Sequence, residues 1–176
     1  WKGRLDFTSC TECGRCQSQC PAWNTEKPLS PKLLITALRD ETYAVAGGST
    51  PRALVGDGSI TDASTYVIDP DVLWACTNCG ACVQQCPVDI EHVDHIVDMR
   101  RYQLLVESNF PAELTSLFKG LESRGNPWNM SPQSRMEWAV GLDFEVPVVG
   151  ETVDSLADVD WLFWVGCAGA YEDRAK

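Results

Sequence analysis

The sequence has no long hydrophobic run. Its most apolar stretch, residues 161–170, is far shorter than the about 20 apolar residues that a transmembrane helix needs. No secretory signal peptide is visible either. Any membrane anchor must therefore lie outside this segment. The chain starts at Trp1 and stops at Lys176, inside an apparent strand–turn–helix unit. We expect it to be a piece of a longer protein.

Positive charge is also scarce. The chain carries 14 basic and 25 acidic side chains, for a formal net charge of −11. A nucleic-acid-binding protein needs a basic surface, so this balance disfavours nucleic acid as a partner. An acidic surface suits docking to a basic patch on a partner protein, and plain solubility explains it equally well.

Histidine is rare, and both copies lie on one predicted helix. His92 and His95 are three residues apart, so they share a helix face. Such a pair can bind haem or a metal, or pass a proton to a quinone. No third ligand accompanies them, so we favour two half-exposed side chains beside Asp94 and Asp98.

What the sequence does have is cysteine in a repeated pattern. Eight of its nine cysteines form two runs of C-x2-C-x2-C-x3-C-P, at residues 10–21 and 76–87. The second run follows the first at a constant offset of 66 residues. Gly14 and Gly80 hold the same place in each run and let the backbone pass close to a bound group.

This spacing is the ligand run of two-cluster ferredoxins, in which the fourth cysteine ligates the other cluster. We therefore predict two [4Fe–4S] clusters with exchanged fourth ligands. Cluster one is assigned to Cys10, Cys13, Cys16 and Cys86, and cluster two to Cys76, Cys79, Cys82 and Cys20. Structural zinc and disulfides are the alternatives, but zinc sites usually split their ligands into two pairs, and disulfides need an oxidising compartment. Free cysteines in this number indicate a reducing, cytoplasmic-facing location.

The 55 residues between the runs look mainly helical. Ser30 and Pro31 form a helix start, and apolar residues then recur at helical spacing to residue 46. We read residues 49–68 as a loop with a short extended piece at 66–68. Further helices are expected from Asp69–Pro70 into Cys76 and over residues 91–108. The predicted fold class is mainly α, with an α-helical ferredoxin domain over residues 1–110.

Residues 111–158 read as a helical extension and an acidic linker. Helices are predicted at 111–123 and from Ser131–Pro132 to about residue 140. Residues 160–165 resemble a buried strand, and a glycine-rich turn and helix start follow. This pattern predicts that residues 159–176 begin an α/β domain. Cys167 at the turn is either a small buried residue or the first ligand of another metal site.

The paired cysteine runs, the helical spacer and the turn at Val165 to Cys167 resemble heterodisulfide-reductase-like iron–sulfur oxidoreductases. Relatives in that family include iron–sulfur subunits of glycerol-3-phosphate, glycolate and lactate dehydrogenases. Cys167 matches the first cysteine of the family's CCG domain, although the CCG triplets do not occur in this sequence. The wider match, which includes Asn126 to Trp128 and Gly166 to Tyr171, resembles actinobacterial membrane-bound electron-transfer-flavoprotein:menaquinone oxidoreductases.

That resemblance implies electron transfer from reduced electron-transfer flavoprotein, loaded during fatty-acid oxidation, to menaquinone. It places the segment at the cytoplasmic face of the membrane, with a membrane region, further cluster, haem or flavin outside it. Our leading hypothesis is a relay for single electrons, in which this segment makes no bonds itself. A structural cluster domain, a soluble ferredoxin-type carrier, and an iron–sulfur subunit of one of the dehydrogenases are the alternatives.

Overall fold

In a computed structural model, the protein is described at residues 2–57 and 64–175. The chain divides into two compact units, Trp1–Phe110 and Pro111–Lys176. This division falls where the sequence predicts the end of the ferredoxin domain. No helix in the described ranges is both long and apolar enough to cross a membrane.

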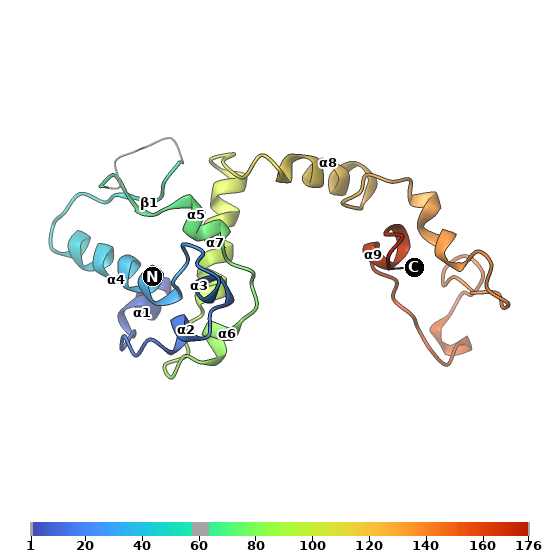
Figure 1. The fold of residues 1–176 in the computed structure, drawn as a ribbon, viewed down its shortest axis with the longest axis horizontal. Helices are drawn as coiled ribbons and strands as arrows, with labels where there is room; N and C mark the ends of the chain where they lie inside the picture. Colours follow the sequence, from blue (N-terminus) through green and yellow to red (C-terminus); the bar gives the residue numbers. More distant parts are fainter. Residues whose placement is uncertain (1, 58–63, 176) are drawn as a thin grey trace. The chain divides into compact units, whose positions relative to one another are not determined.

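Unit 1 is built from helices and one small sheet (Figure 1). Its order is α1 (Lys2–Thr8), α2 (Arg15–Ser18), α3 (Pro21–Asn24), α4 (Pro31–Ala46), β1 (Ala53–Val55), β2 (Tyr66–Ile68), α5 (Pro70–Trp74), α6 (Ala81–Gln84) and α7 (His92–Leu105). The mainly helical prediction is confirmed for this unit. Helix α1 was not predicted, and the structure adds it at the N-terminal side of the first cysteine run.

Two helices begin where the sequence places a capping side chain before proline. Ser30 Oγ accepts a hydrogen bond from the Leu33 N–H at 3.2 Å and starts α4. Asp69 Oδ1 accepts from the Asp71 N–H at 2.8 Å and starts α5. These bonds satisfy amide groups that have no partner inside the helix, and proline at the next position needs none.

The helix ends depart slightly from the predictions. Helix α4 has the predicted bounds, whereas α5 stops at Trp74, two residues before Cys76. Helix α7 stops at Leu105 instead of residue 108, where Ser108 adopts a left-handed φ of 52°. A left-handed residue cannot continue a right-handed helix.

The loop between α4 and α5 contains more structure than predicted. The extended piece at residues 66–68 is β2, and it pairs in parallel with β1, with Val55 opposite Ile68. Strand β1 was missed because three residues carry too short a pattern to distinguish from loop. The rest of the predicted loop, residues 58–63, lies outside the described residues.

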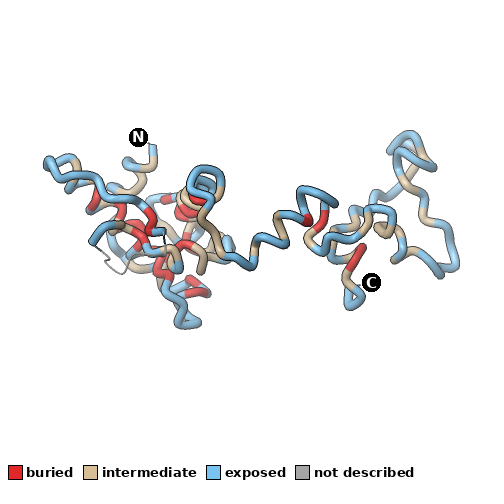
Figure 2. Tube along the Cα trace, turned by 90° about the horizontal axis from the view of Figure 1, so that it is seen from above, coloured by how far each residue is buried: buried red, intermediate tan, exposed pale blue. Residues whose placement is uncertain are grey.

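Unit 1 has a core of buried side chains, and its buried segments are red in Figure 2. Its apolar members come from α4 and α7, from the residues just before these two helices, from both strands and from α5. They are Leu29, Leu34, Ile35, Leu38, Val55, Ile68, Leu73, Ile90 and Ile96. Cys20 and Ala22 belong to the same cluster. The two cysteine loops are therefore anchored on packed side chains.

Unit 2 contains α8 (Leu114–Arg124), the 3-10 helices η1 (Pro132–Ala139) and η2 (Leu156–Asp158), and α9 (Cys167–Tyr171). Ser131 caps η1 by accepting from the Gln133 N–H at 3.3 Å, as the sequence suggested. Asn126 is fully buried and forms hydrogen bonds with the carbonyls of Arg124 and Met130 and with the Met130 N–H. These bonds close the turn after α8.

The strand predicted at residues 160–165 does not form. Residues 161–166 have no regular structure, and Trp161 and Trp164 are 92% and 86% exposed. A strand needs a neighbouring strand to bond its amides and carbonyls. Within the described part of unit 2, the only pairing of this kind is an isolated bridge between Val149 and Val153. The prediction of a buried strand is therefore wrong for this segment.

Candidate iron–sulfur site

Four cysteines from the two runs surround one small cavity. Cys10, Cys13 and Cys16 come from the segment between α1 and α2 and from α2 itself, and Cys86 follows α6. All four line the same cavity, together with Gly14 and Thr11. We call these four residues set one. They are the four residues that the sequence grouped as cluster one.

The other four surround a second cavity. Cys76, Cys79 and Cys82 come from the segment between α5 and α6 and from α6 itself, and Cys20 stands just before α3. We call these four residues set two. Helices α2 and α6 are in contact with each other, and this contact brings the last cysteine of each run to the cavity of the other run.

The pKa shifts of the two buried thiols divide the cysteines into the same two sets as the cavities do. Burial raises the pKa of Cys16, and the neighbouring thiols of Cys10, Cys13 and Cys86 raise it further. Burial raises the pKa of Cys82 to about 12, with further contributions from Cys76 and Cys20. Each buried sulfur therefore senses the charges of its own set. Binding of metal must supply the positive charge that removes these protons.

The backbone of the two runs repeats as closely as the sequence does. Glu12 and Asn78 occupy the same place in each run and have left-handed φ values of 58° and 55°. Gly14 and Gly80 follow two residues later, with φ values of 79° and 76°. These turns wrap each run around its cavity. Short helices α2 and α6 then carry the third cysteine of each set.

Each set offers four thiols, the number that a cubane cluster needs. No group of three or more His, Cys, Asp or Glu side chains within residues 2–57 and 64–175 is placed to hold one metal ion. A structural zinc site requires four ligands around the same ion. A cubane instead distributes its four thiolates over four irons. Eight thiols in two groups of four match the ligand demand of such clusters.

The surroundings of the two sets differ in charge. Glu12 and Lys32 line the cavity of set one, and Arg39 Nη2 lies 2.9 Å from Glu12 Oε1. The cavity of set two is lined mainly by apolar side chains, among them Leu29, Val93 and Ile96. The guanidinium of Arg100 approaches the loop of set two from α7. The sequence singled out Arg100 and Arg101 without deciding their contacts.

The two histidines are not half-exposed beside their neighbouring aspartates, so that prediction is corrected. His92 is 2% exposed, lines the cavity of set one, and donates from Nδ1 to the Ile90 carbonyl at 2.8 Å. Burial lowers the pKa of His92, which favours the neutral ring. His95 Nε2 lies 3.0 Å from Asp6 Oδ2. Asp6 belongs to helix α1, which the sequence did not predict.

Cys167 lies in unit 2, in a different setting. Arg135 Nη2 donates to Cys167 Sγ at 3.3 Å, and Arg135 Nη1 donates to the Val165 carbonyl at 3.3 Å. The bond to Cys167 raises the pKa of Arg135. Residues 111–176 contain no second cysteine. A metal-binding role for Cys167 therefore remains a prediction.

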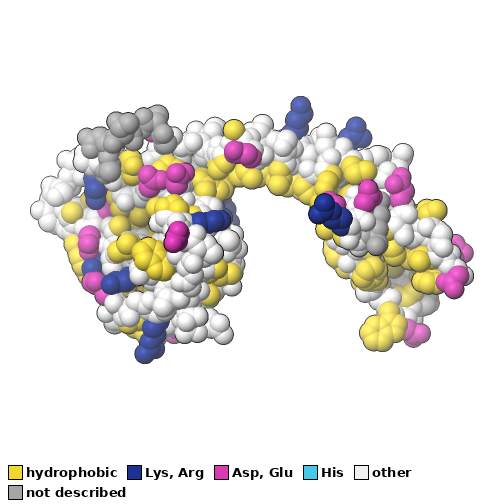
Figure 3. Space-filling view, viewed as in Figure 1, with side chains coloured by type: hydrophobic (Ala, Val, Ile, Leu, Met, Phe, Trp, Pro, Cys, Tyr) yellow, Lys and Arg dark blue, Asp and Glu magenta, His cyan; other side chains and the backbone are white. Residues whose placement is uncertain are grey.

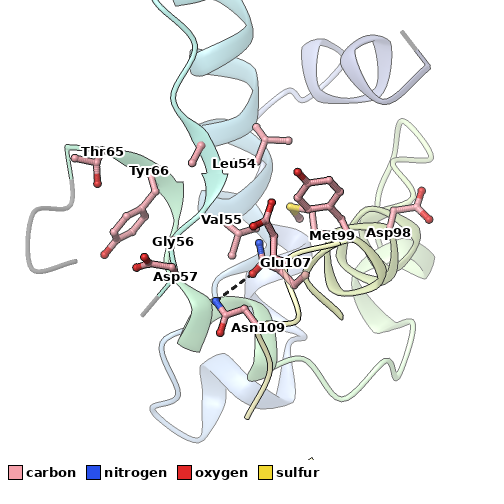
Figure 4. Close-up of a pocket in the computed structure, with 13 residues that line it drawn as sticks. Leu54, Val55, Gly56, Asp57, Thr65, Tyr66, Asp98, Met99, Glu107 and Asn109 are labelled. Carbon is pink, nitrogen blue, oxygen red and sulfur yellow. Dashed lines mark hydrogen bonds between the residues drawn. The ribbon is translucent and has the colours of Figure 1, made fainter. Parts of the chain in front are cut away.

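A more voluminous pocket of unit 1 lies away from the cysteines (Figure 4). It has a volume of about 620 Å³ and lies between the strands and the C-terminal part of α7. Leu54, Val55 and Met99 give it apolar walls, and Asp57 and Glu107 line it as well. No cysteine is among its described lining residues. The eight cysteines of the two sets line the two smaller cavities instead.

The region that contains the two cysteine runs matches a known family of protein domains. Residues 9–90 match the 4Fe-4S dicluster domain. The match begins one residue before Cys10 and ends after Cys86, so it includes all eight cysteines of the two sets. The cofactor chemistry of this region is therefore that of 4Fe-4S clusters.

Similar curated proteins cover almost the whole chain. A probable iron–sulfur-binding oxidoreductase, FadF of Bacillus subtilis, is 35% identical over 98% of this chain and 28% of its own length. A probable membrane-anchored ferredoxin of Chromohalobacter salexigens is 35% identical over 94% of this chain and 26% of its length. An EtfAB:quinone oxidoreductase of Syntrophomonas wolfei is 33% identical over 100% of this chain and 27% of its length. The chain thus spans about a quarter of these relatives.

More distant similarity reaches the heterodisulfide reductases. One subunit of the dihydromethanophenazine:CoB–CoM heterodisulfide reductase of Methanosarcina mazei is 26% identical over 97% of this chain and 39% of its own length. Residues 9–90 therefore belong to the 4Fe-4S dicluster domain family, and the chain is a homologue of the iron–sulfur oxidoreductases that include the heterodisulfide reductase subunits.

Proposed function

We propose that set one and set two each bind one [4Fe–4S] cluster and that the chain relays single electrons between them. The observation that carries this proposal is the grouping of eight cysteines into two crossed sets of four. Bound clusters would supply one-electron redox chemistry, with potentials set by charge, burial and hydrogen bonds to sulfur. The contact between α2 and α6 keeps the two sets close together.

The chain's own residues would bind the clusters and shield them. In each set the third cysteine is buried, with Cys16 8% and Cys82 7% exposed. The backbone amides of Gln17 and Val83 lower the pKa of Cys16 and Cys82 and so partly oppose the effect of burial. A hydrogen bond to sulfur stabilises a thiolate over a thiol. In contrast, Cys13 and Cys79 are exposed, so each set has one side open to a redox partner.

As donor we propose a reduced electron-transfer flavoprotein, and as acceptor menaquinone or a haem in a membrane region outside this segment. The relative named EtfAB:quinone oxidoreductase supports this pairing, because its similarity extends over the whole of this chain. The formal charge of −11 suits a donor with a basic docking surface. The relay would then operate at the cytoplasmic face of the membrane.

Iron analysis and electron paramagnetic resonance (EPR) of the anaerobically purified holoprotein test this proposal. Two clusters require about eight irons and about eight acid-labile sulfides per chain. Dithionite reduction should give two spin systems that interact, because the sets lie in one small unit. A colourless protein that contains zinc, or a protein with about four irons and a single isolated spin, would refute it.

A further inference from the structure

One side chain ties the loop of set two to a helix that carries no cysteine. Arg100, on α7, donates from Nε and Nη2 to the Leu73 carbonyl at 3.2 and 2.8 Å. Its Nη2 also donates to the Cys76 carbonyl at 2.7 Å. Its Cζ lies 5.0 Å from the centre of the Trp74 ring. The guanidinium therefore contacts each part of the segment that leads from α5 into the second cysteine run.

These contacts satisfy carbonyl groups that α5 cannot bond itself. The last carbonyls of a helix have no partner within it, and a cation near them interacts favourably with the helix dipole. The planar guanidinium of arginine can donate hydrogen bonds to two carbonyls at once in a fixed geometry. The ammonium of lysine is a point charge whose donors have no such fixed geometry. Arg100 thus fixes the backbone at Cys76, the first cysteine of set two.

The same guanidinium lies next to a hydrogen bond to sulfur. The Asn78 N–H donates to Cys76 Sγ at 3.4 Å, and Asn78 holds this position with a left-handed φ of 55°. Arg100 Nη1 is 3.5 Å from Asn78 Oδ1. Hydrogen bonds to the sulfurs and nearby charge both affect the reduction potential of a cluster. Arg100 therefore affects both the hydrogen bonding and the charge around the Cys76 sulfur.

Two cations near set one, Arg39 and Lys32, are paired with carboxylates, whereas Arg15 of the same run is exposed to solvent and takes part in none of the ion pairs found among the described residues. Arg39 lies 2.9 Å from Glu12 and 3.1 Å from Asp40, and Lys32 lies 4.0 Å from Glu12. Glu12 occupies the place that Asn78 has in the second run. Arg100, by contrast, takes part in none of the ion pairs found among the described residues. Its positive charge therefore acts on set two without a compensating carboxylate in contact.

We propose that Arg100 is a positioning residue that raises the reduction potential at set two and not at set one. This inference rests on the proposed binding of one cluster by each set. When one electron passes from the reduced flavoprotein donor onto set two, one negative charge is added there, and it leaves again to the acceptor. A fixed cation stabilises the reduced state by Coulomb attraction, and more strongly where water is excluded.

The test is a potentiometric EPR titration of the anaerobically purified holoprotein and its variants. The couple that disappears in Cys79→Ala is assigned to set two. Arg100→Gln should lower the equilibrium constant for reduction of that couple by about tenfold. For one electron, this corresponds to a shift of the reduction potential by about 59 mV toward more negative values. Arg100→Lys keeps the charge and should shift the same couple by less. Arg101→Gln is the matched control, because Arg101 is exposed and pairs with Asp98 at 2.6 Å, and it should shift neither couple.

The outcomes separate this inference from the function it rests on. A wild-type protein without two reducible clusters refutes the proposed function, before any variant is compared. With two clusters present, unchanged potentials in Arg100→Gln, or equal shifts in both couples, overturn the role of Arg100. If Arg100→Gln loses its clusters, Arg100→Met, which also removes the charge but keeps a long side chain, replaces it: a selective negative shift at set two supports the inference, and unchanged potentials overturn it.

Discussion

At the scale of single residues, the cysteine spacing predicts two sets of four, and the same eight cysteines line two cavities in groups of four. The two runs repeat at a constant offset, and the structure has the same left-handed turns at Glu12 and Asn78. The burial of His92 and the contacts of Arg100 could not be predicted in this way. Both depend on packing against α1 and α5, and no local pattern encodes contacts between segments so far apart in sequence.

The exchange of fourth cysteines gives a prediction at this scale. In the crossed arrangement, Cys20→Ala should remove the cluster of set two although Cys20 belongs to the first run. Its EPR spectrum should then resemble that of Cys79→Ala, and the spectrum of Cys86→Ala should resemble that of Cys13→Ala. The reverse resemblance would mean that each run binds its own cluster with four local ligands.

A second prediction concerns the left-handed glycine of the second run. Gly80 has a φ of 76°, and an added Cβ would meet no atom within 4 Å. Without a bound cluster, the cost of Gly80→Ala is therefore backbone strain alone, about 1–2 kcal/mol of unfolding free energy. Gly3→Ala is the control, since Gly3 lies inside α1 and its Cβ would make ordinary contacts at 3.5 Å. Anaerobic denaturant titration should show the loss for Gly80→Ala and none for Gly3→Ala.

At the scale of elements, capping residues predicted helix starts well, and apolar content predicted strands poorly. Helices α4, α5 and η1 start at the predicted Ser–Pro or Asp–Pro pairs. A capping side chain bonds a backbone amide two or three residues away, so the local sequence is enough to predict where the helix starts. Residues 160–165 have the composition of a buried strand, but a strand also needs a partner, and the described part of unit 2 places none beside this segment.

The link between α4 and β1 gives a prediction about pH. Glu41 accepts hydrogen bonds from the Arg52 N–H at 2.9 Å and from Arg52 Nε at 2.8 Å. These bonds lower the pKa of Glu41. A carboxyl with a lowered folded-state pKa stabilises the fold above its unfolded pKa, about 4.3, and this contribution is lost as pH falls through the folded value.

Glu41→Gln should therefore weaken the acid-dependent loss of stability in unit 1. Thermal unfolding measured from mildly acidic pH downwards, compared with the wild type, checks this. Asp40→Asn, on the neighbouring exposed residue, is the control. The assignment would be wrong if Glu41→Gln and wild type lost stability in parallel across the whole acid range.

At the scale of the whole molecule, the match to the 4Fe-4S dicluster domain lies entirely within unit 1. All eight cysteines of the two sets and the apolar core of this unit lie before Pro111. Charged side chains are scattered over the face of this unit shown in Figure 3, without a basic patch there. An excess of acidic side chains over the whole chain suits a basic partner better than an acidic one.

This organisation predicts that residues 1–110 hold the clusters without unit 2. A fragment of that length, reconstituted anaerobically, should bind as much iron and sulfide per chain as the whole sequence and give the same reduced EPR spectrum. The matched control is the same fragment with Cys13→Ala, which should lose one cluster. A fragment that binds no iron would show that unit 2 is needed for the site.

The central claim is that two cubanes share exchanged cysteine ligands, and a crystal structure of the anaerobic holoprotein with iron anomalous scattering tests it most directly. The account predicts two compact groups of iron, one bound by Cys10, Cys13, Cys16 and Cys86 and the other by Cys76, Cys79, Cys82 and Cys20. Iron bound by Cys10, Cys13, Cys16 and Cys20 together, or a single metal ion in place of either group, would contradict it.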